Sequence, residues 1–74
     1  MPKLPVVKAR ELIRALQQQG FVILVQVGSH VQLKHPDGRR TTIPFHAGKD
    51  IKPGTLLNIL RQINMSKVDL QRIL

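Results

Sequence analysis

The side chains of this sequence that could do chemistry are its histidines and its many cations. An imidazole titrates near pH 6.5, so a histidine can accept or donate a proton at neutral pH. RNA carries its own nucleophile in the 2′-OH, and its cleavage requires only that the backbone be held, a proton moved and phosphorane charge stabilised. One histidine and a few cations would suffice. The candidates are His30 for proton transfer and Lys34, Arg39, Arg40 and Lys49 for the phosphate charge.

The three histidines receive different interpretations. His35 precedes a turn and is interpreted as structural, whereas His46 follows Pro44 in a loop and is a possible auxiliary group. Spacing alone leaves open that His30 is only an exposed histidine on a solvated strand. Its direct neighbour Ser29 is poorly placed as a nucleophile, because adjacent residues of a strand point to opposite faces.

No metal or cofactor site is indicated by the remaining residues. Two-metal phosphodiester chemistry needs several convergent carboxylates, and the four acids of this chain are scattered along it. The histidines, five and eleven residues apart, match no short zinc signature, and there is no cysteine. A glycine-rich phosphate loop is also missing. We therefore expect neither a metal nor a small-molecule cofactor. The acids are Glu11, Asp37, Asp50 and Asp69.

The composition is that of a small, folded and strongly basic chain. Twelve Lys and Arg stand against four Asp and Glu among 74 residues, a formal charge of +8, and 42% of the residues are hydrophobic. This predicts one folded domain over residues 1–74, not a disordered basic segment. The longest apolar run, residues 21–25, is too short to cross a membrane. We expect a soluble, cytoplasmic protein without membrane contact, whose partner is a nucleic acid or an acidic protein.

Helices are predicted at both ends of the chain. Apolar residues recur at helical spacing over residues 9–16, and Gly20 suits the left-handed position that ends a helix. No usual N-cap residue precedes the start of this helix. A second helix is predicted over residues 53–63, where Asn64 can end it. A serine and an aspartate spaced as a capping box open a short last helix over residues 66–74.

Three strands are predicted between these helices, over residues 21–27, 30–34 and 39–43. A Gly-Ser pair joins the first two as a tight hairpin, and the Pro-Asp-Gly turn at residues 36–38 joins the last two. Pro44 cannot donate to a sheet and should lie at an edge or at a strand end. The expected sheet order is 1-2-3.

Alternation along the second strand decides where the candidate histidine lies. Val31 and Leu33 share one face of the strand, and His30 and Lys34 share the other. Helices packed on one face of a three-stranded antiparallel sheet form a two-layer α+β domain and leave the other sheet face solvated. His30 is therefore expected on the open face.

A series of short motifs is similar to that of a known family. In order along the chain, the motifs are Gly28-Ser29-His30, His35-Pro36-Asp37-Gly38-Arg39-Arg40, Ile43-Pro44, His46, Gly48-Lys49 and Gly54-Thr55-Leu56 followed by Ile59-Leu60-Arg61-Gln62. Through them the chain, from about Val7 to Leu74, resembles the HicA family of mRNA interferase toxins.

The resemblance implies a fold like that of a double-stranded-RNA-binding domain, ribosome-independent cleavage of mRNA and neutralisation by a HicB-type antitoxin. It also implies that the histidine of the Gly-Ser-His motif, here His30, is catalytic. Residues 25–27 depart from the family in lacking the basic residue often found before this motif.

Three functional interpretations follow. The first is a metal-independent endoribonuclease of a toxin–antitoxin system, in which His30 transfers a proton and nearby cations hold the RNA. The second is a non-catalytic double-stranded-RNA-binding module, which would share the fold and charge without using this histidine. The third is a basic structural or ribosome-associated protein. Replacing His30 distinguishes the first interpretation from the other two.

Overall fold

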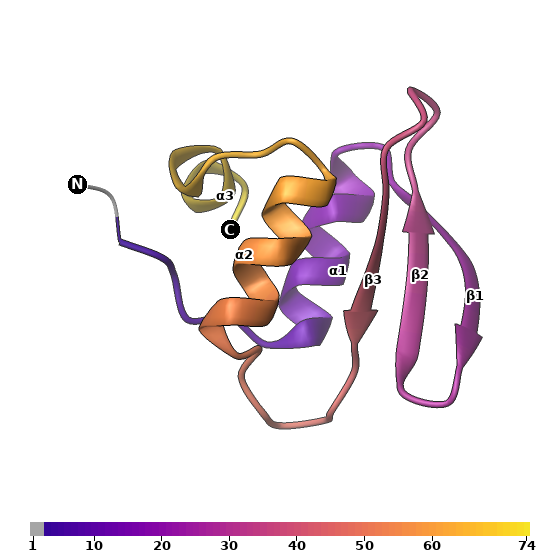
Figure 1. Cartoon of the computed structure of the whole chain (residues 1–74), viewed down its shortest axis with the longest axis horizontal. Helices are drawn as coiled ribbons and strands as arrows, with labels where there is room; N and C mark the ends of the chain where they lie inside the picture. The colour runs from indigo at the N-terminus through magenta and orange to yellow at the C-terminus, as the bar shows by residue number, and fades with distance from the viewer. Residues whose placement is uncertain (1–2) are drawn as a thin grey trace.

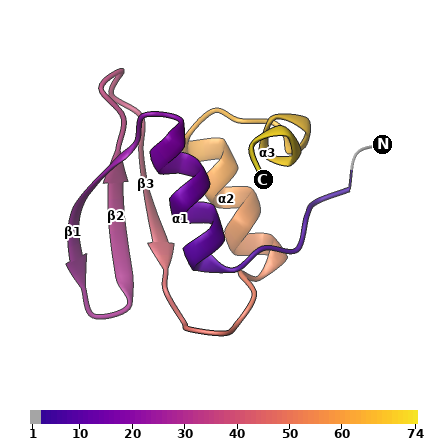
Figure 2. The same cartoon turned by 180° about the vertical axis from the view of Figure 1, so that it is seen from behind.

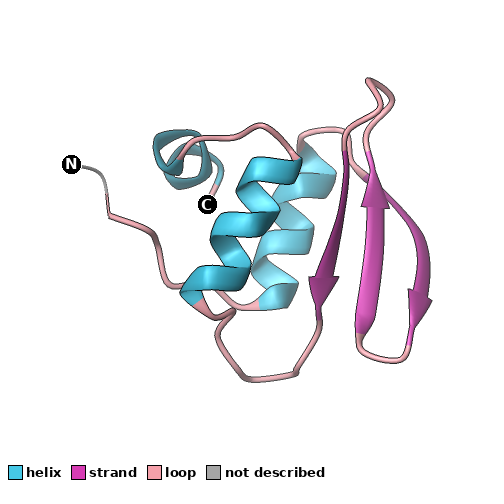
Figure 3. Ribbon diagram, viewed as in Figure 1, coloured by secondary structure: helices cyan, strands magenta, loops and turns pink. Residues whose placement is uncertain are grey.

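The computed structural model describes residues 3–74, and its elements follow the predicted order. The strands form one antiparallel sheet in the order β1-β2-β3, and the helices gather on one side of it (Figures 1 and 3). This confirms the two-layer α+β arrangement. The elements are α1 (Ala9–Gln18), β1 (Val22–Val27), β2 (His30–Lys34), β3 (Arg40–Pro44), α2 (Pro53–Gln62) and α3 (Lys67–Ile73).

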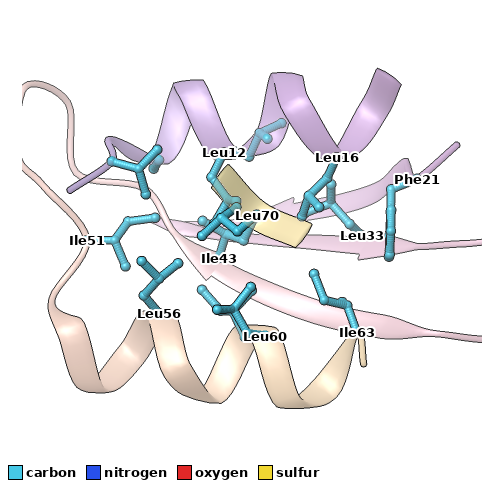
Figure 4. Close-up of a cluster of buried hydrophobic side chains, with 14 of the residues drawn as sticks. Leu12, Leu16, Phe21, Leu33, Ile43, Ile51, Leu56, Leu60, Ile63 and Leu70 are labelled. Carbon is cyan, nitrogen blue, oxygen red and sulfur yellow. The ribbon is translucent and has the colours of Figure 1, made fainter. Parts of the chain in front are cut away.

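The core lies between the sheet and the two longer helices. In β2 and β3 buried residues alternate with exposed ones, so that each strand turns one face toward α1 and α2. Figure 2 shows the two helices side by side against the sheet. Leu70 anchors the short α3 on the same cluster and is fully buried. The side chains that meet in this core include Leu12, Leu16, Leu33, Ile43, Leu56 and Leu60 (Figure 4).

Both longer helices end as their sequences predict. Gly20 adopts φ +100° after α1, and the N–H of Phe21 donates to the carbonyl of Leu16 at 3.0 Å. Asn64 adopts φ +54° after α2, and the next residue again donates back to a carbonyl of the last turn. These are left-handed caps of the kind that glycine and asparagine favour, because they satisfy the final carbonyls of a helix.

The helix starts differ in how they are capped. Ser66 and Asp69 cap α3 reciprocally, each backbone N–H donating to the other side chain at 3.0 Å, which confirms the predicted capping box. At α1 the cap comes from inside the helix, since the backbone N–H of Lys8 donates to Glu11 Oε1 at 3.0 Å. A carboxylate three residues along thus satisfies the N–H of the N-cap residue itself, and no N-cap side chain accepts a hydrogen bond from the first turn.

The edge strands differ in detail from the prediction. β1 begins at Val22, because Phe21 turns into the core and is 2% exposed. β3 extends to Pro44, which takes the last position of an outer strand, where a missing N–H is tolerated. Every residue of β1 is exposed, since the helices lie nearest β3 and β1 is the strand farthest from them (Figure 1). Within residues 3–74, no helix has the length and apolar character needed to span a membrane.

Candidate functional site

The face of the sheet turned away from the helices carries the predicted proton-transfer group and two of the predicted cations. β2 and β3 run antiparallel with Lys34 opposite Arg40 and His30 opposite Pro44, so opposed side chains share a face. We call this surface the open face; its polar residues are His30, Gln32, Lys34, Arg40 and Thr42, all exposed.

The hairpin turn places His30 at the first position of β2. Gly28 adopts φ +58° at the first central position of the turn, while Ser29 does not have a positive φ, which is the type II′ geometry that suits a hairpin. The N–H of Phe45 donates to the Ser29 carbonyl and ties the end of β3 to this turn. Within residues 3–74 the ring of His30 forms no hydrogen bond or ion pair, so both of its nitrogens are open to a ligand.

Two cations lie side by side at the other end of β2. Lys34 and Arg40 are directly opposed across the β2–β3 pair, and like charges in this position are unfavourable. An anion that binds between them removes the repulsion. His30 is four residues from Lys34 along the strand, about 13 Å at the usual rise per residue. The open face thus has one end suited to proton transfer and one suited to phosphate.

Arg39, a predicted phosphate contact, lies on the helix side of the sheet and is held there. Its Nε donates to Asp37 Oδ2 at 2.7 Å and its Nη1 donates to the carbonyl of Ile63, at the end of α2, at 2.8 Å. Its guanidinium also lies 5.1 Å from the centre of the Phe21 ring, within the range of a cation–π contact. These contacts bind the turn before β3 to the end of α2.

His35 lies beside this cluster, and the structure confirms its structural role. Its Nδ1 lies 3.1 Å from both the backbone nitrogen and Oδ1 of Asp37. Its Nε2 donates to the carbonyl of Gln19 at 3.0 Å, because a carbonyl oxygen can only accept. The ring packs edge-on against Phe21, with centroids 5.0 Å apart. The backbone N–H of Arg39 donates to Asp37 and lowers the pKa of that carboxyl. His35 therefore has no nitrogen left for chemistry.

His46 and Lys49 lie together in the loop that follows β3. The loop is pinned to the segment before α1, because the N–H of Ile51 donates to the Val7 carbonyl at 2.9 Å. His46 and Lys49 are exposed and line one hollow of about 350 Å³ with Lys52. Since Pro44 pairs with His30, the loop leaves the sheet at the end that carries the candidate histidine.

Further cations, which belong to none of the predicted site residues, also lie near this loop. Lys8 and Arg10, at the start of α1, line a second hollow together with His46 and Gly48. They are more than thirty residues from His46 in the sequence, and no local pattern connects them. Among residues 3–74, no three His, Asp or Glu side chains are grouped so that they could hold a metal ion.

Together these features define a class of protein: a small, basic α+β protein with an unpaired histidine and opposed cations on an uncovered sheet. The family model described as the HicA toxin of bacterial toxin-antitoxin matches residues 9–65. The chain belongs to this family and is a toxin of the toxin–antitoxin type. No curated protein matches the chain.

Proposed function

We propose that the chain, as one domain over residues 1–74, is a metal-independent endoribonuclease that cleaves mRNA. His30 is the proton-transfer group, and His46 is an auxiliary group at the same end of the sheet. Lys34, Arg40 and Lys49 hold the phosphate backbone. The observation that carries the proposal is the unpaired His30 ring on the same open face as the directly opposed Lys34 and Arg40. Arg39 is left out of the phosphate contacts because its guanidinium is already bound.

The reaction needs no group beyond these side chains and the RNA. His30 removes the proton of the 2′-OH, and the oxygen attacks the adjacent phosphorus. The bond from phosphorus to the 5′ oxygen breaks, and that oxygen leaves with a proton supplied by an acid, for which His46 is the candidate. The products are a 2′,3′-cyclic phosphate and a 5′-OH end. Lys49, on the loop at the His30 end of the sheet, is the candidate to stabilise the additional negative charge of the phosphorane, whereas Lys34 and Arg40 hold phosphates farther along the RNA.

Inhibition in this proposal comes from a HicB-type antitoxin, the second protein of the pair. The formal charge of +8 favours an acidic partner, because charge complementarity speeds association and disfavours wrong partners. A toxin that cleaves mRNA and is inhibited by an antitoxin would act in the cytoplasm.

The test of this proposal is His30→Ala. Loss of a positioned general acid or base costs about 10²- to 10⁴-fold in rate, so the variant should lose RNA cleavage and toxicity. The side chain is exposed, so the free energy of unfolding should change by no more than about 0.5 kcal/mol. RNA binding should persist through the cations of the open face. Cleavage is measured on a defined RNA, and folding by circular dichroism.

The matched control is Gln32→Ala, on the same face and strand as His30. It should remain folded and keep most of its activity. His46→Ala should reduce cleavage less than His30→Ala. If His30→Ala cleaves at the wild-type rate, His30 is not the proton-transfer group. RNA binding by a wild-type chain that does not cleave RNA would favour a non-catalytic RNA-binding module.

A further inference from the structure

The surface that the proposed mechanism leaves unused is the outer strand β1. Its sequence is Val-Ile-Leu-Val-Gln-Val, without a charged residue. Its valines, isoleucine and leucine are between 44% and 62% exposed. A contiguous apolar surface of this kind on a small protein marks an interaction site, because exposing it to water is unfavourable.

The free edge of β1 also lacks the protection that edge strands usually have. Natural edge strands carry lysine, arginine or proline, or are covered by another element. The other outer strand, β3, has Arg40 and Pro44 at its ends, and the Thr41 hydroxyl donates to Gln62 Oε1 of α2 at 2.7 Å. β1 has only a bulge at Leu24, on the side that pairs with β2. Its outward N–H and C=O groups are open to another strand.

The charges beside β1 indicate what that strand should carry. On the helix side, Arg10 and Arg14 line a hollow together with Ile23 of β1. On the open face, Lys34 lies opposite Val22. Cations therefore border β1 on both faces, and none of the four acids of the chain lies in β1 or β2. A second copy of this chain would bring the same cations together, with +8 on each side.

We propose that the free edge of β1 binds an extended segment of an acidic partner protein, which adds a fourth strand to the sheet. Main-chain hydrogen bonds would supply affinity, apolar side chains would cover the valines, and carboxylates would pair with Arg10, Arg14 or Lys34. The identification of this partner as the antitoxin rests on the proposed function.

The added strand would also control access to the candidate site. Val27 of β1 lies directly opposite His30 of β2. A strand beyond β1 lies two strand spacings from β2, about 10 Å. The body of the partner is then beside His30, where it blocks an RNA strand that approaches the open face. This edge pairing would hold an inhibitor beside the histidine without requiring that it contact the imidazole.

The first experiment uses a blocked ten-residue peptide of alternating valine and glutamate as the probe, with the full-length chain. Binding should slow hydrogen exchange of the outward amides of β1, measured by NMR, and should weaken as salt is added. The matched probes are a valine–lysine peptide, which should not bind, and a valine–glutamate peptide with a central proline, which should bind much more weakly because it cannot complete the ladder.

The second experiment uses variants of β1. Val25→Glu places a carboxylate beside the acidic strand and should weaken binding of the valine–glutamate peptide about tenfold. Val25→Thr preserves the branched shape and should bind within about threefold of the wild type. Val68→Glu makes the same charge change at an exposed valine of α3 and should leave peptide binding unchanged.

Binding of the acidic peptide without protection of β1 amides overturns the proposal, and so does equal binding of the valine–lysine peptide. Concentration-dependent dimers that protect β1 in the absence of peptide would show that the occupant is a second copy. RNA cleavage by the free chain is measured in parallel. Cleavage that depends on His30 without protection of β1 rejects only the edge-pairing proposal, whereas protection of β1 without cleavage rejects only the proposed enzyme.

Discussion

Arg39 and Arg40 are sequence neighbours whose side chains lie on opposite faces of the sheet. Arg40 is exposed on the open face, opposite Lys34. The guanidinium of Arg39 binds Asp37 and the Ile63 carbonyl. The two histidines differ in the same way. His30 is exposed on the open face, whereas both ring nitrogens of His35 are bound within the protein. At the residue scale, function is therefore assigned by the face on which a side chain lies.

The two arginines give a matched prediction. Arg39→Ala should lower the free energy of unfolding by about 1–3 kcal/mol, because it leaves a helix-end carbonyl without its charged donor. Arg40→Ala should change it by no more than about 0.5 kcal/mol, but should weaken RNA binding and reduce its dependence on salt. Urea denaturation and RNA binding at several salt concentrations measure the two effects. The assignment fails if Arg39→Ala weakens RNA binding while remaining as stable as the wild type.

The elements are held in place by their ends, and the junction between α1 and β1 leaves no room for a side chain at Gly20. Gly20 adopts φ +100° there, and a Cβ at this position would lie 2.9 Å from His35 Nε2. Gly20→Ala should therefore destabilise the protein by about 1–3 kcal/mol through backbone strain and contact with the ring. Gly54→Ala is the control, since a Cβ on that residue of α2 meets nothing within 4 Å. Thermal denaturation of both variants tests this, and equal melting temperatures would contradict it.

The cap of α3 makes stability depend on acid. The backbone N–H of Ser66 donates to Asp69 and holds the pKa of that carboxyl below its ordinary value of 3.8. A carboxyl whose pKa is lower in the folded state stabilises the protein above its unfolded pKa, and this contribution is lost as the pH falls through the folded pKa. Asp69→Ala should thus be less stable than the wild type at neutral pH, with the difference shrinking in strong acid. Melting temperatures of both proteins from neutral pH to strong acid measure this difference in stability. A difference that persists undiminished in acid would show that the pKa shift of Asp69 is not its cause.

At the scale of the whole molecule, lysines and arginines that give a formal charge of +8 surround a sheet with one uncovered face. Cleavage by the proposed mechanism should survive excess EDTA and should leave a 2′,3′-cyclic phosphate and a 5′-OH end. Metal-activated water would usually leave a 5′-phosphate and require an added divalent ion. Mass spectrometry of the cleaved RNA, with and without chelator, distinguishes the two. Chelator-sensitive cleavage with 5′-phosphate ends would rule out the histidine mechanism.

Local features of the sequence were enough to predict the element order and the face that carries His30. A helix end depends on a residue that tolerates positive φ, such as Gly20 or Asn64, and the faces of β2 follow from a period of two. Both signals involve residues that are close in the sequence. The motif resemblance added the family, which the match over residues 9–65 confirms.

Only the tertiary structure decided which of the other side chains are exposed and which are bound within the protein. The apolar run at the start of β1 is typical of a buried strand, yet β1 is exposed because the helices lie nearest β3, at the opposite edge of the sheet. Arg39 was predicted to contact phosphate, but its guanidinium binds Asp37 and the carbonyl of Ile63, which is 24 residues away. The hollow between His46 and the start of α1 also joins distant segments. Such contacts depend on packing between layers. No local sequence pattern specifies which cation binds within the protein and which remains exposed.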